Sequence, residues 1–312
     1  MNRILVFLIL LAYHNNVYGQ QTILITKDRD NYYEEYSVLK SDKKIRHGRC
    51  LKLSKPLLGG YSFELVGNYS DGLKDGYWET YYENINNIRD KGFYKNDIMD
   101  SIWVYFYPEG IRRNLAEVES DDGLSLQVVN ANPIASKTGR YKNGELSGVW
   151  EYFDQRGVIY QKFDHDNDSL IFFNNADINN IEAGFIGGEF LLRQHLYDVF
   201  DFYGTMSTIN SKIALQPTRI VLRFTIDEEG RLSDVTELEN TANNKKISAR
   251  AWETTQSLDA LWYPGKNNGI PQITTKTIIF KLDVNVKYET RWTENTTFSG
   301  KTKGLNFTIE VE

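Results

Sequence analysis

The sequence predicts a mostly β protein, in which stacked β-hairpin repeats precede a C-terminal α+β domain. That domain is expected to hold a ββαβ antiparallel sheet with a helix on one side. A pattern of glycine, tyrosine and tryptophan that recurs in the first half predicts the hairpins. Alternating apolar residues and one segment of helical period predict the second domain. The 312 residues also exceed the roughly 100–200 that one domain usually takes.

The composition excludes several classes of protein. With 41% hydrophobic and 25% charged residues, the chain is too apolar to be largely disordered. The 36 Lys and Arg residues against 42 Asp and Glu give a net charge of −6, so we expect no nucleic-acid partner. A single cysteine, Cys50, cannot form a disulfide within the chain or a multi-cysteine metal site. The high aromatic content, 13%, must be explained by the repeats.

Residues 1–19 have the layout of a secretory signal peptide. A short basic start precedes the apolar run Ile4–Ala12, and the small residue Gly19 lies near the expected cleavage site. The run is shorter than the roughly 20 apolar residues of a membrane span. A chain without disulfides fits the periplasm of a Gram-negative bacterium better than eukaryotic secretion. We therefore expect a periplasmic protein exported by a cleaved signal peptide; the alternative is an uncleaved N-terminus that anchors it in the membrane.

Residues 20–165 are predicted to form β-hairpin repeats. In each of three segments, tyrosine follows the leading glycine by two positions, a turn residue by five, a small residue by nine and tryptophan by eleven. The segments are Gly67–Trp78, Gly92–Trp103 and Gly139–Trp150. Asn-Gly and similar pairs favour tight hairpins, and alternating aromatic residues fit a pleated surface. Each hairpin is too small to bury its own aromatic face, so neighbouring hairpins must stack.

The spacing of the repeats predicts two further, degenerate copies. One is expected between residues 110 and 138, because the leading glycines at 67, 92 and 139 are 25 and then 47 residues apart. The other is Ile45–Cys50, where Cys50 takes the place of tryptophan. Over residues 45–165 the pattern resembles the MORN repeat family in its bacterial variant. The resemblance implies a repeat scaffold, which members of that family use for many purposes.

Residues 184–286 are predicted to form the second domain. Arg219–Ile226 and Arg231–Leu238 alternate as the strands of a hairpin, and Lys245–Leu261 has a nearly helical period. A third strand follows, and its apolar face carries Ile278, Phe280, Leu282 and Val284. The order β-β-α-β favours an antiparallel sheet with a helix on one side.

Motifs in these elements resemble the C-terminal domain of TonB-type energy transducers. They are Phe224-Thr-Ile226-Asp227-Glu-Glu-Gly230, Asp234-Val235, Trp262-Tyr-Pro264-Gly-Lys-Asn-Asn268-Gly269-Ile-Pro271 and Phe280-Lys-Leu282, with Gly187-Gly188 as a lead-in. Phe202-Tyr203-Gly204 departs from the Tyr-Pro that the family has before the first strand. A cleaved signal and only 6 prolines leave neither anchor nor stalk, so full energy transduction is not expected.

The resemblance implies a peptide-binding site. In that family the domain captures an extended peptide of an outer-membrane transporter, which adds as a strand to the sheet edge. The receiving strand here would be Thr274–Asp283, with Thr275, Thr277, Ile279 and Lys281 as the candidate contacts. The alternative is that these four are ordinary solvent-facing residues of an edge strand. The polar tail, residues 287–312, could also pair with that edge and block it.

No sequence motif predicts an enzyme. The chain contains no nucleophile elbow, P-loop, HExxH or dinucleotide fingerprint, and its histidines are isolated, so we expect neither catalytic residues nor a cofactor. Asp164–Asp168 resembles the start of a Ca²⁺ loop. However, Ser169 stands in place of the sharp-turn glycine and Asn175 in place of the bidentate glutamate. An acidic surface loop without a metal is therefore the expectation.

Two functions remain open from the sequence. The first is a periplasmic, non-enzymatic binding protein linked to outer-membrane transport, whose partner is the N-terminal peptide of a transporter or another envelope protein. The second is an envelope scaffold whose repeats present aromatic residues to a protein or glycan. An exposed aromatic surface would favour the scaffold. Burial of Trp78, Trp103 and Trp150 would remove its main support.

Overall fold

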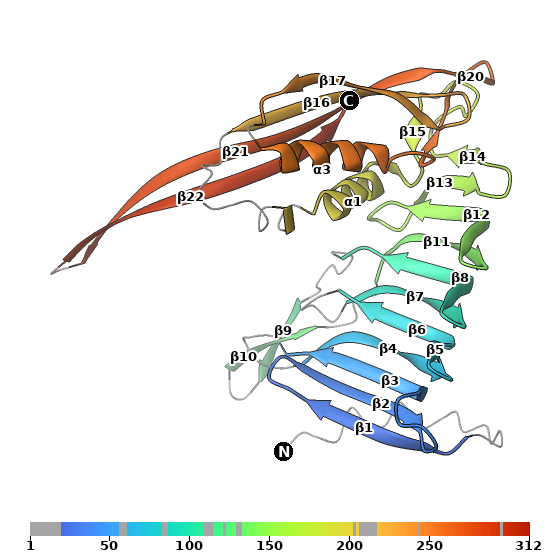
Figure 1. The fold of residues 1–312 in the computed structure, drawn as a ribbon, viewed down its shortest axis with the longest axis vertical. Coiled ribbons are helices and arrows are strands. Elements are labelled where there is room, and N and C mark those ends of the chain that lie inside the picture. Colours follow the sequence, from blue (N-terminus) through green and yellow to red (C-terminus); the bar gives the residue numbers. More distant parts are fainter. Residues whose placement is uncertain are drawn as a thin grey trace. The chain divides into compact units, whose positions relative to one another are not determined.

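The computed structural model describes residues 20–55, 61–82, 87–108, 115–120, 123–128, 133–201, 204–205, 217–242, 244–293 and 296–312 (Figure 1). It confirms the predicted fold class, with stacked antiparallel hairpins followed by a sheet that carries helices. The predicted signal peptide, residues 1–19, lies outside the described residues. In the part of the chain that is described, no helix has the length and apolar character needed to cross a membrane.

The chain divides into two compact units, which are described separately. The first comprises residues 1–148 and 154–157, and the second comprises residues 149–153 and 158–312. The strands of the repeats are β1 (Thr22–Asp28), β2 (Tyr32–Leu39), β3 (Arg46–Ser54), β4 (Ser62–Ser70), β5 (Leu73–Lys74), β6 (Gly76–Tyr81), β7 (Ile88–Lys95), β8 (Ile98–Phe106), β11 (Ala135–Lys142), β12 (Glu145–Phe153), β13 (Ile159–Asp164) and β14 (Ser169–Phe173). In the first unit the strand order is β1-β2-β3-β4-β6-β7-β8-β11, so each hairpin pairs with the next one along the chain.

One predicted repeat is not part of this sheet. β9 (Leu115–Ser120) and β10 (Gly123–Val128) form a separate two-stranded sheet, and β8 pairs directly with β11. The prediction of a stacked unit between residues 110 and 138 is therefore wrong, because the pairing of β8 with β11 leaves no place for it. The early degenerate copy does take its place in the sheet. Cys50 stands opposite Gly67, as Trp78 stands opposite Gly92.

Glycine and tryptophan form the repeated contact of the first unit. The Trp78 ring lies over Gly67, where an added Cβ atom would come within 2.1 Å of the ring. The Trp103 ring lies over Gly92 in the same way, at 2.2 Å. A side chain at either glycine would therefore displace a ring that is only 1% exposed. Among the described residues, this contact buries large aromatic side chains against glycines of the same sheet.

Hydrogen bonds and ring contacts repeat with the same spacing. In two successive hairpins, the tryptophan Nε1 donates a 3.0 Å hydrogen bond to the carbonyl of the residue after the leading glycine. The tyrosine that follows packs edge to face on the tryptophan, with ring centroids 5.1 Å apart. These residues are Asn68 and Tyr69 for Trp78, and Phe93 and Tyr94 for Trp103. The polar indole group is thus satisfied in a buried position, which avoids the cost of an unpaired donor.

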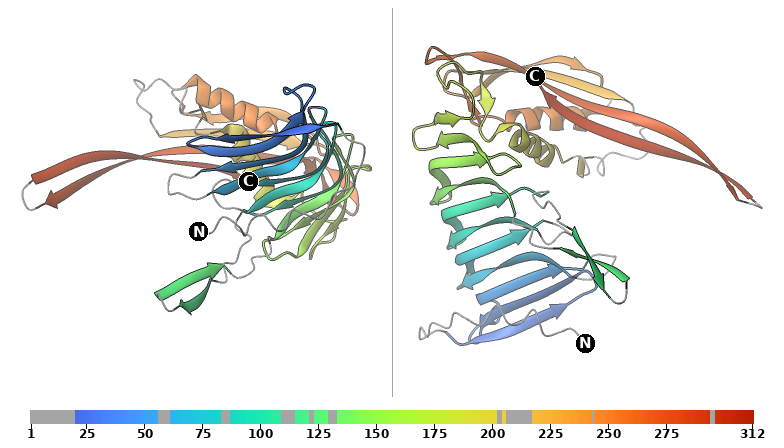
Figure 2. Two further views of the ribbon diagram at one scale, coloured as in Figure 1. Left: turned by 90° about the horizontal axis from the view of Figure 1, so that it is seen from below. Right: turned by 180° about the vertical axis from the view of Figure 1, so that it is seen from behind.

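The second unit contains the predicted ββαβ sheet. Its elements are β15 (Gly184–Phe185), α1 (Gly188–Phe200), β16 (Thr218–Ile226), β17 (Leu232–Asn240), α3 (Lys245–Gln256), β18 (Trp262–Tyr263), β19 (Gly265–Asn267), β20 (Ile270–Gln272), β21 (Thr274–Thr293) and β22 (Thr296–Val311). The main antiparallel sheet has the order β17-β16-β21-β22. Figure 2 shows β21 and β22 continuing past β16 as a two-stranded ribbon.

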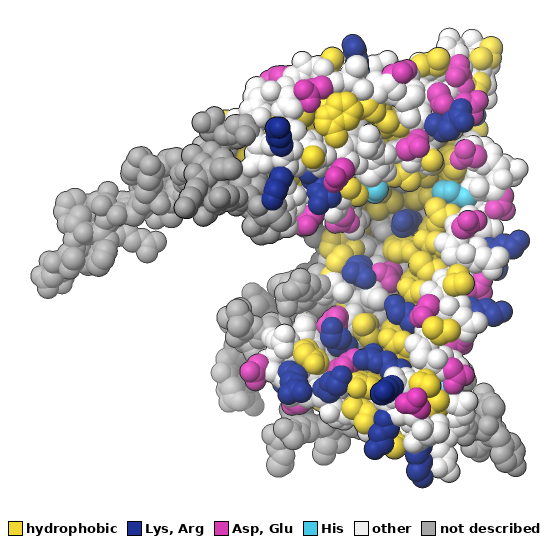
Figure 3. Space-filling view, viewed as in Figure 1, with side chains coloured by type: hydrophobic (Ala, Val, Ile, Leu, Met, Phe, Trp, Pro, Cys, Tyr) yellow, Lys and Arg dark blue, Asp and Glu magenta, His cyan; other side chains and the backbone are white. Residues whose placement is uncertain are grey.

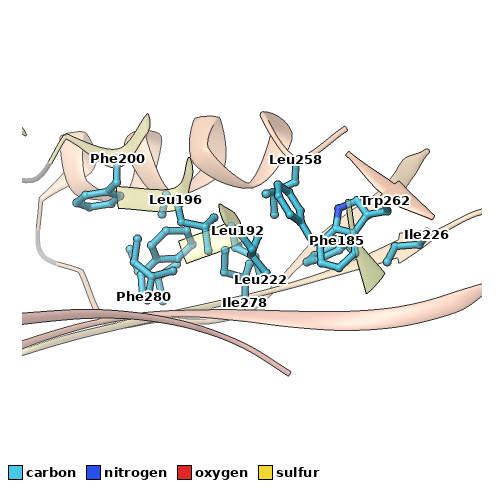
Figure 4. Packing of buried hydrophobic residues seen from close by; sticks show 14 of the residues in the cluster. Phe185, Leu192, Leu196, Phe200, Leu222, Ile226, Leu258, Trp262, Ile278 and Phe280 are labelled. Carbon is cyan, nitrogen blue, oxygen red and sulfur yellow. The ribbon is translucent and has the colours of Figure 1, made fainter. Parts of the chain in front are cut away.

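Apolar side chains of both helices and of the sheet form the core of the second unit. Figure 4 shows Leu192, Leu196 and Phe200 of α1 pointing toward side chains of the sheet. Phe200 stacks on Phe280, with ring centroids 5.6 Å apart. The fully buried members of the cluster include Ile220, Leu222, Phe224, Ile226, Ala251, Leu258 and Ile278. Neither α1 nor the full length of β22 was expected from the sequence.

The motif residues of this domain shape a turn and its packing. Gly230 has a φ of +81°, and a Cβ atom there would lie 2.2 Å from the carbonyl oxygen of Trp262. The Asp227 carboxylate accepts backbone hydrogen bonds from Glu229 at 3.0 Å and from Arg231 at 2.8 Å. Position 230 therefore requires glycine, because the backbone has a positive φ there and because a Cβ atom would clash with the Trp262 carbonyl. These contacts give the motif a structural role.

Side chains of β13 fix the entry to α1 within the second unit. The Gln161 side-chain oxygen accepts a hydrogen bond from the backbone N–H of Gly187, and the Tyr160 hydroxyl donates to the carbonyl of Gly187. Gln161 is fully buried. The hairpin β13–β14 is therefore bound directly to the start of the C-terminal domain, although its sequence belongs to the repeats.

Candidate functional site

The structure places the predicted receiving strand inside the sheet. Along β21, residues Thr274–Leu282 pair with β16, and Ile278–Thr293 pair with β22. Thr277 and Glu312 exchange two backbone hydrogen bonds of 2.8 Å. The prediction that Thr274–Asp283 is a sheet edge is therefore wrong from Thr277 onward. The alternative, in which the C-terminal tail pairs with this strand, is confirmed.

The four candidate contacts lie on the sheet face opposite the helices, where they alternate with the core residues of β21. Thr275 and Lys281 are exposed, and Thr277 is half-buried. Ile279 was expected to face outward, but only 5% of it is exposed. It pairs directly with Val221, which is also buried, so two apolar side chains shield each other on an otherwise polar face.

The two edges of the sheet differ in regularity. β17 contains two register shifts against β16 and a residue of positive φ, Asp234 at 51°. Such bulges are a common protection of edge strands against further pairing. β22 pairs with β21 over its 16 residues without a register shift. The edge formed by β22 is therefore the one shaped to accept another strand.

The outer side of β22 presents backbone groups at alternate residues. Because Glu312 bonds inward to Thr277, the residues of opposite parity direct their N–H and C=O groups away from β21. These residues are Phe307, Ile309 and Val311. Among the described residues, no strand pairs with this side of β22.

The core holds this edge in place from the helix side. Ile309 is 7% exposed, and the Phe307 ring stacks on Phe200 with centroids 4.4 Å apart. The Tyr197 ring of α1 meets Phe307 edge to face at 6.0 Å, and the Tyr197 hydroxyl donates a 3.4 Å hydrogen bond to the outward carbonyl oxygen of Phe307. The alternation from Phe307 to Val311 was the sequence signal for this strand. The spacing of Leu192, Leu196 and Phe200 was the signal for α1.

The acidic segment Asp164–Asp168 forms the turn between β13 and β14. The Asn167 side chain donates a 2.8 Å hydrogen bond to the Asp164 carboxylate, and the Asp166 backbone N–H donates one of 3.0 Å. These bonds hold the pKa of Asp164 below its ordinary value, with the Asn167 side chain as the main cause. The carboxylate is thus committed to the turn. Across the described residues, no group of three or more His, Cys, Asp or Glu is placed to hold a metal ion.

The tryptophans of the repeats are buried. Trp78 and Trp103 are 1% exposed and Trp150 is 0% exposed, so they form no exposed binding surface. Figure 3 shows hydrophobic side chains beside both basic and acidic ones on one face of the repeat sheet. Lys74, for example, lies 4.9 Å from the Trp78 ring centroid. Because the three tryptophans are buried, the main support for the scaffold function is removed.

Comparison with known proteins gives no family for this chain. No protein-family model matches it, and no curated protein matches it. The resemblances to MORN repeats and to the TonB C-terminal domain stay predictions that depend on the motifs.

Proposed function

We propose that the protein binds an extended segment of a partner protein, which adds as a further strand along the outer side of β22. The observation that carries this proposal is the regular edge of β22, with the outward backbone groups of Ile309 and Val311. Main-chain hydrogen bonds supply affinity in strand addition, at a net gain of about 0.5–1.5 kcal/mol for each bond. Because packing against the core already orders this edge, the protein itself loses little conformational entropy on binding.

We propose further that the partner is the N-terminal peptide of an outer-membrane transporter or another envelope protein. This follows the resemblance of the C-terminal domain to TonB-type transducers and the signal-peptide layout of residues 1–19. In this proposal the protein is periplasmic and non-enzymatic, and it is linked to outer-membrane transport. In this proposal the repeats have a structural role and not a binding role, because their tryptophans are used for packing.

A matched pair of variants at Val311 tests the site. Val311→Pro removes one outward N–H and leaves the bonds to β21 intact, whereas Val311→Ala keeps the N–H. Calorimetric titration of the full chain with a peptide of about nine alternating threonine and valine residues, and with transporter N-terminal peptides, measures binding. We expect the proline variant to bind at least about tenfold more weakly than the alanine variant. Equal affinities in the two folded variants would contradict the proposed site.

A further inference from the structure

At the C-terminal end of β22, two exposed glutamates lie on the sheet face that the helices do not cover, which we call the open face. Glu310 pairs with Ile279 and Glu312 with Thr277, which places both on the sheet face opposite the helices. Neither makes an ion pair with another described residue. Two ion pairs lie elsewhere on this sheet, Arg219 with Glu239 at 2.9 Å and Lys281 with Asp283 at 3.4 Å.

The two glutamates would face alternate residues of an added strand. Their own N–H and C=O groups point toward β21, so in an antiparallel outer ladder they occupy the non-hydrogen-bonded positions. At those positions the Cα atoms of opposite residues are only about 4.5 Å apart, and their side chains are close. Opposite charges attract there, and like charges repel.

The helix side of the same edge favours apolar residues. The side chains of Phe307, Ile309 and Val311 pack against the core, and Tyr197 is 37% exposed beside Phe307. A strand added here would place its other alternate residues along this apolar border. The two faces of the edge therefore prefer different residue types.

We propose that this edge selects a basic amphipathic strand, with Lys or Arg opposite Glu310 and Glu312 and apolar residues between them. The inference rests on the proposed function, and it specifies the partner by charge. A second copy of β22 does not satisfy the pattern, because its own open-face residues Glu310 and Glu312 are acidic.

Two peptides of matched composition test the selection. Both have valine at alternate positions, and the remaining positions are lysine in one and glutamate in the other. Titration of the full chain at low salt is expected to show at least about tenfold tighter binding of the lysine peptide. The preference should shrink as salt is raised.

Charge reversal of the edge supplies the second measurement. The variant E310K/E312K should prefer the glutamate peptide, while the control variant E145K/E228K, with the same change in net charge, should keep the original preference. Equal affinity for both peptides would overturn the charge selection and leave the proposed function standing. If neither peptide and no neutral peptide binds, the proposed function fails as well.

Discussion

The two units bury aromatic side chains in different ways. In the first unit the tryptophan rings lie flat over glycines of the same sheet, as Trp103 does over Gly92. In the second unit, Phe200 and Phe280 meet between a helix and a sheet. A single sheet can thus form its own core when glycine leaves room for a ring. The cost of this solution is a strict dependence on glycine beneath each such ring, as at Gly67 and Gly92.

The comparison also explains where a partner strand can add. In the first unit, hairpins follow one another along the chain, each is paired with the next, and β1 is the edge strand. In the second unit, β17 and the terminal strand β22 lie at the edges. Within the second unit, β17 is bulged and β22 is regular, so we assign binding there to β22.

The largest expected effect tests the glycine and tryptophan contact. Trp103→Ala should destabilise the first unit by about 3–5 kcal/mol, because it empties a fully buried site. Gly92→Ala should also destabilise it, since its Cβ atom would meet the Trp103 ring at 2.2 Å. Amide hydrogen exchange of β7 and β8 during denaturation measures both changes.

The double variant is the control for this contact. If the glycine is needed only to make room for the ring, Gly92→Ala should cost much less in the Trp103→Ala background than alone. Additive losses would show that Gly92 is required for another reason.

A smaller effect is expected from the edge strand of the second unit. Ile309→Ala should lower the free energy of unfolding by about 2 kcal/mol, because Ile309 is 7% exposed within the core cluster. The exposed neighbour Glu310→Ala should change it by less than about 0.5 kcal/mol. If both substitutions have the same small effect on the free energy of unfolding, β22 is not part of the core, and the assignment of this edge to the packed sheet is wrong.

The smallest effect concerns the turn at Asp164. Its pKa in the folded chain is lowered mainly by the Asn167 side chain, so the turn stabilises the fold above the unfolded pKa of about 3.9. That contribution is lost as the pH falls through the lower, folded pKa. Carboxyl NMR titration should give a value below about 3.9 for Asp164. Asn167→Ala should raise the value, and an unchanged value would contradict the assigned cause.

Local sequence patterns were enough to predict most of the fold. Pairings between segments distant in the sequence were the hardest feature to predict. Each repeat carries its own glycine, turn and tryptophan, so three of them could be aligned from the sequence. The burial of Ile279 depends on its cross-strand neighbour Val221, which no local pattern reveals. The pairing of β21 with β22 is likewise a contact between strands, and it depends on which edge of the sheet is left open to the C-terminal tail. The helix α1 was not predicted, because it begins at Gly187-Gly188 and glycine is a poor helix former.

The central claim is that a partner strand adds along the outer side of β22. Residue-resolved amide hydrogen exchange, with and without a bound lysine and valine peptide, tests this claim most directly. We predict new protection at the outward amides of Ile309 and Val311. The inward amides of Thr308 and Glu310 should stay as protected as before. Protection that instead appears along β17 or among the repeats, with none gained at the amides of Ile309 and Val311, would contradict the account.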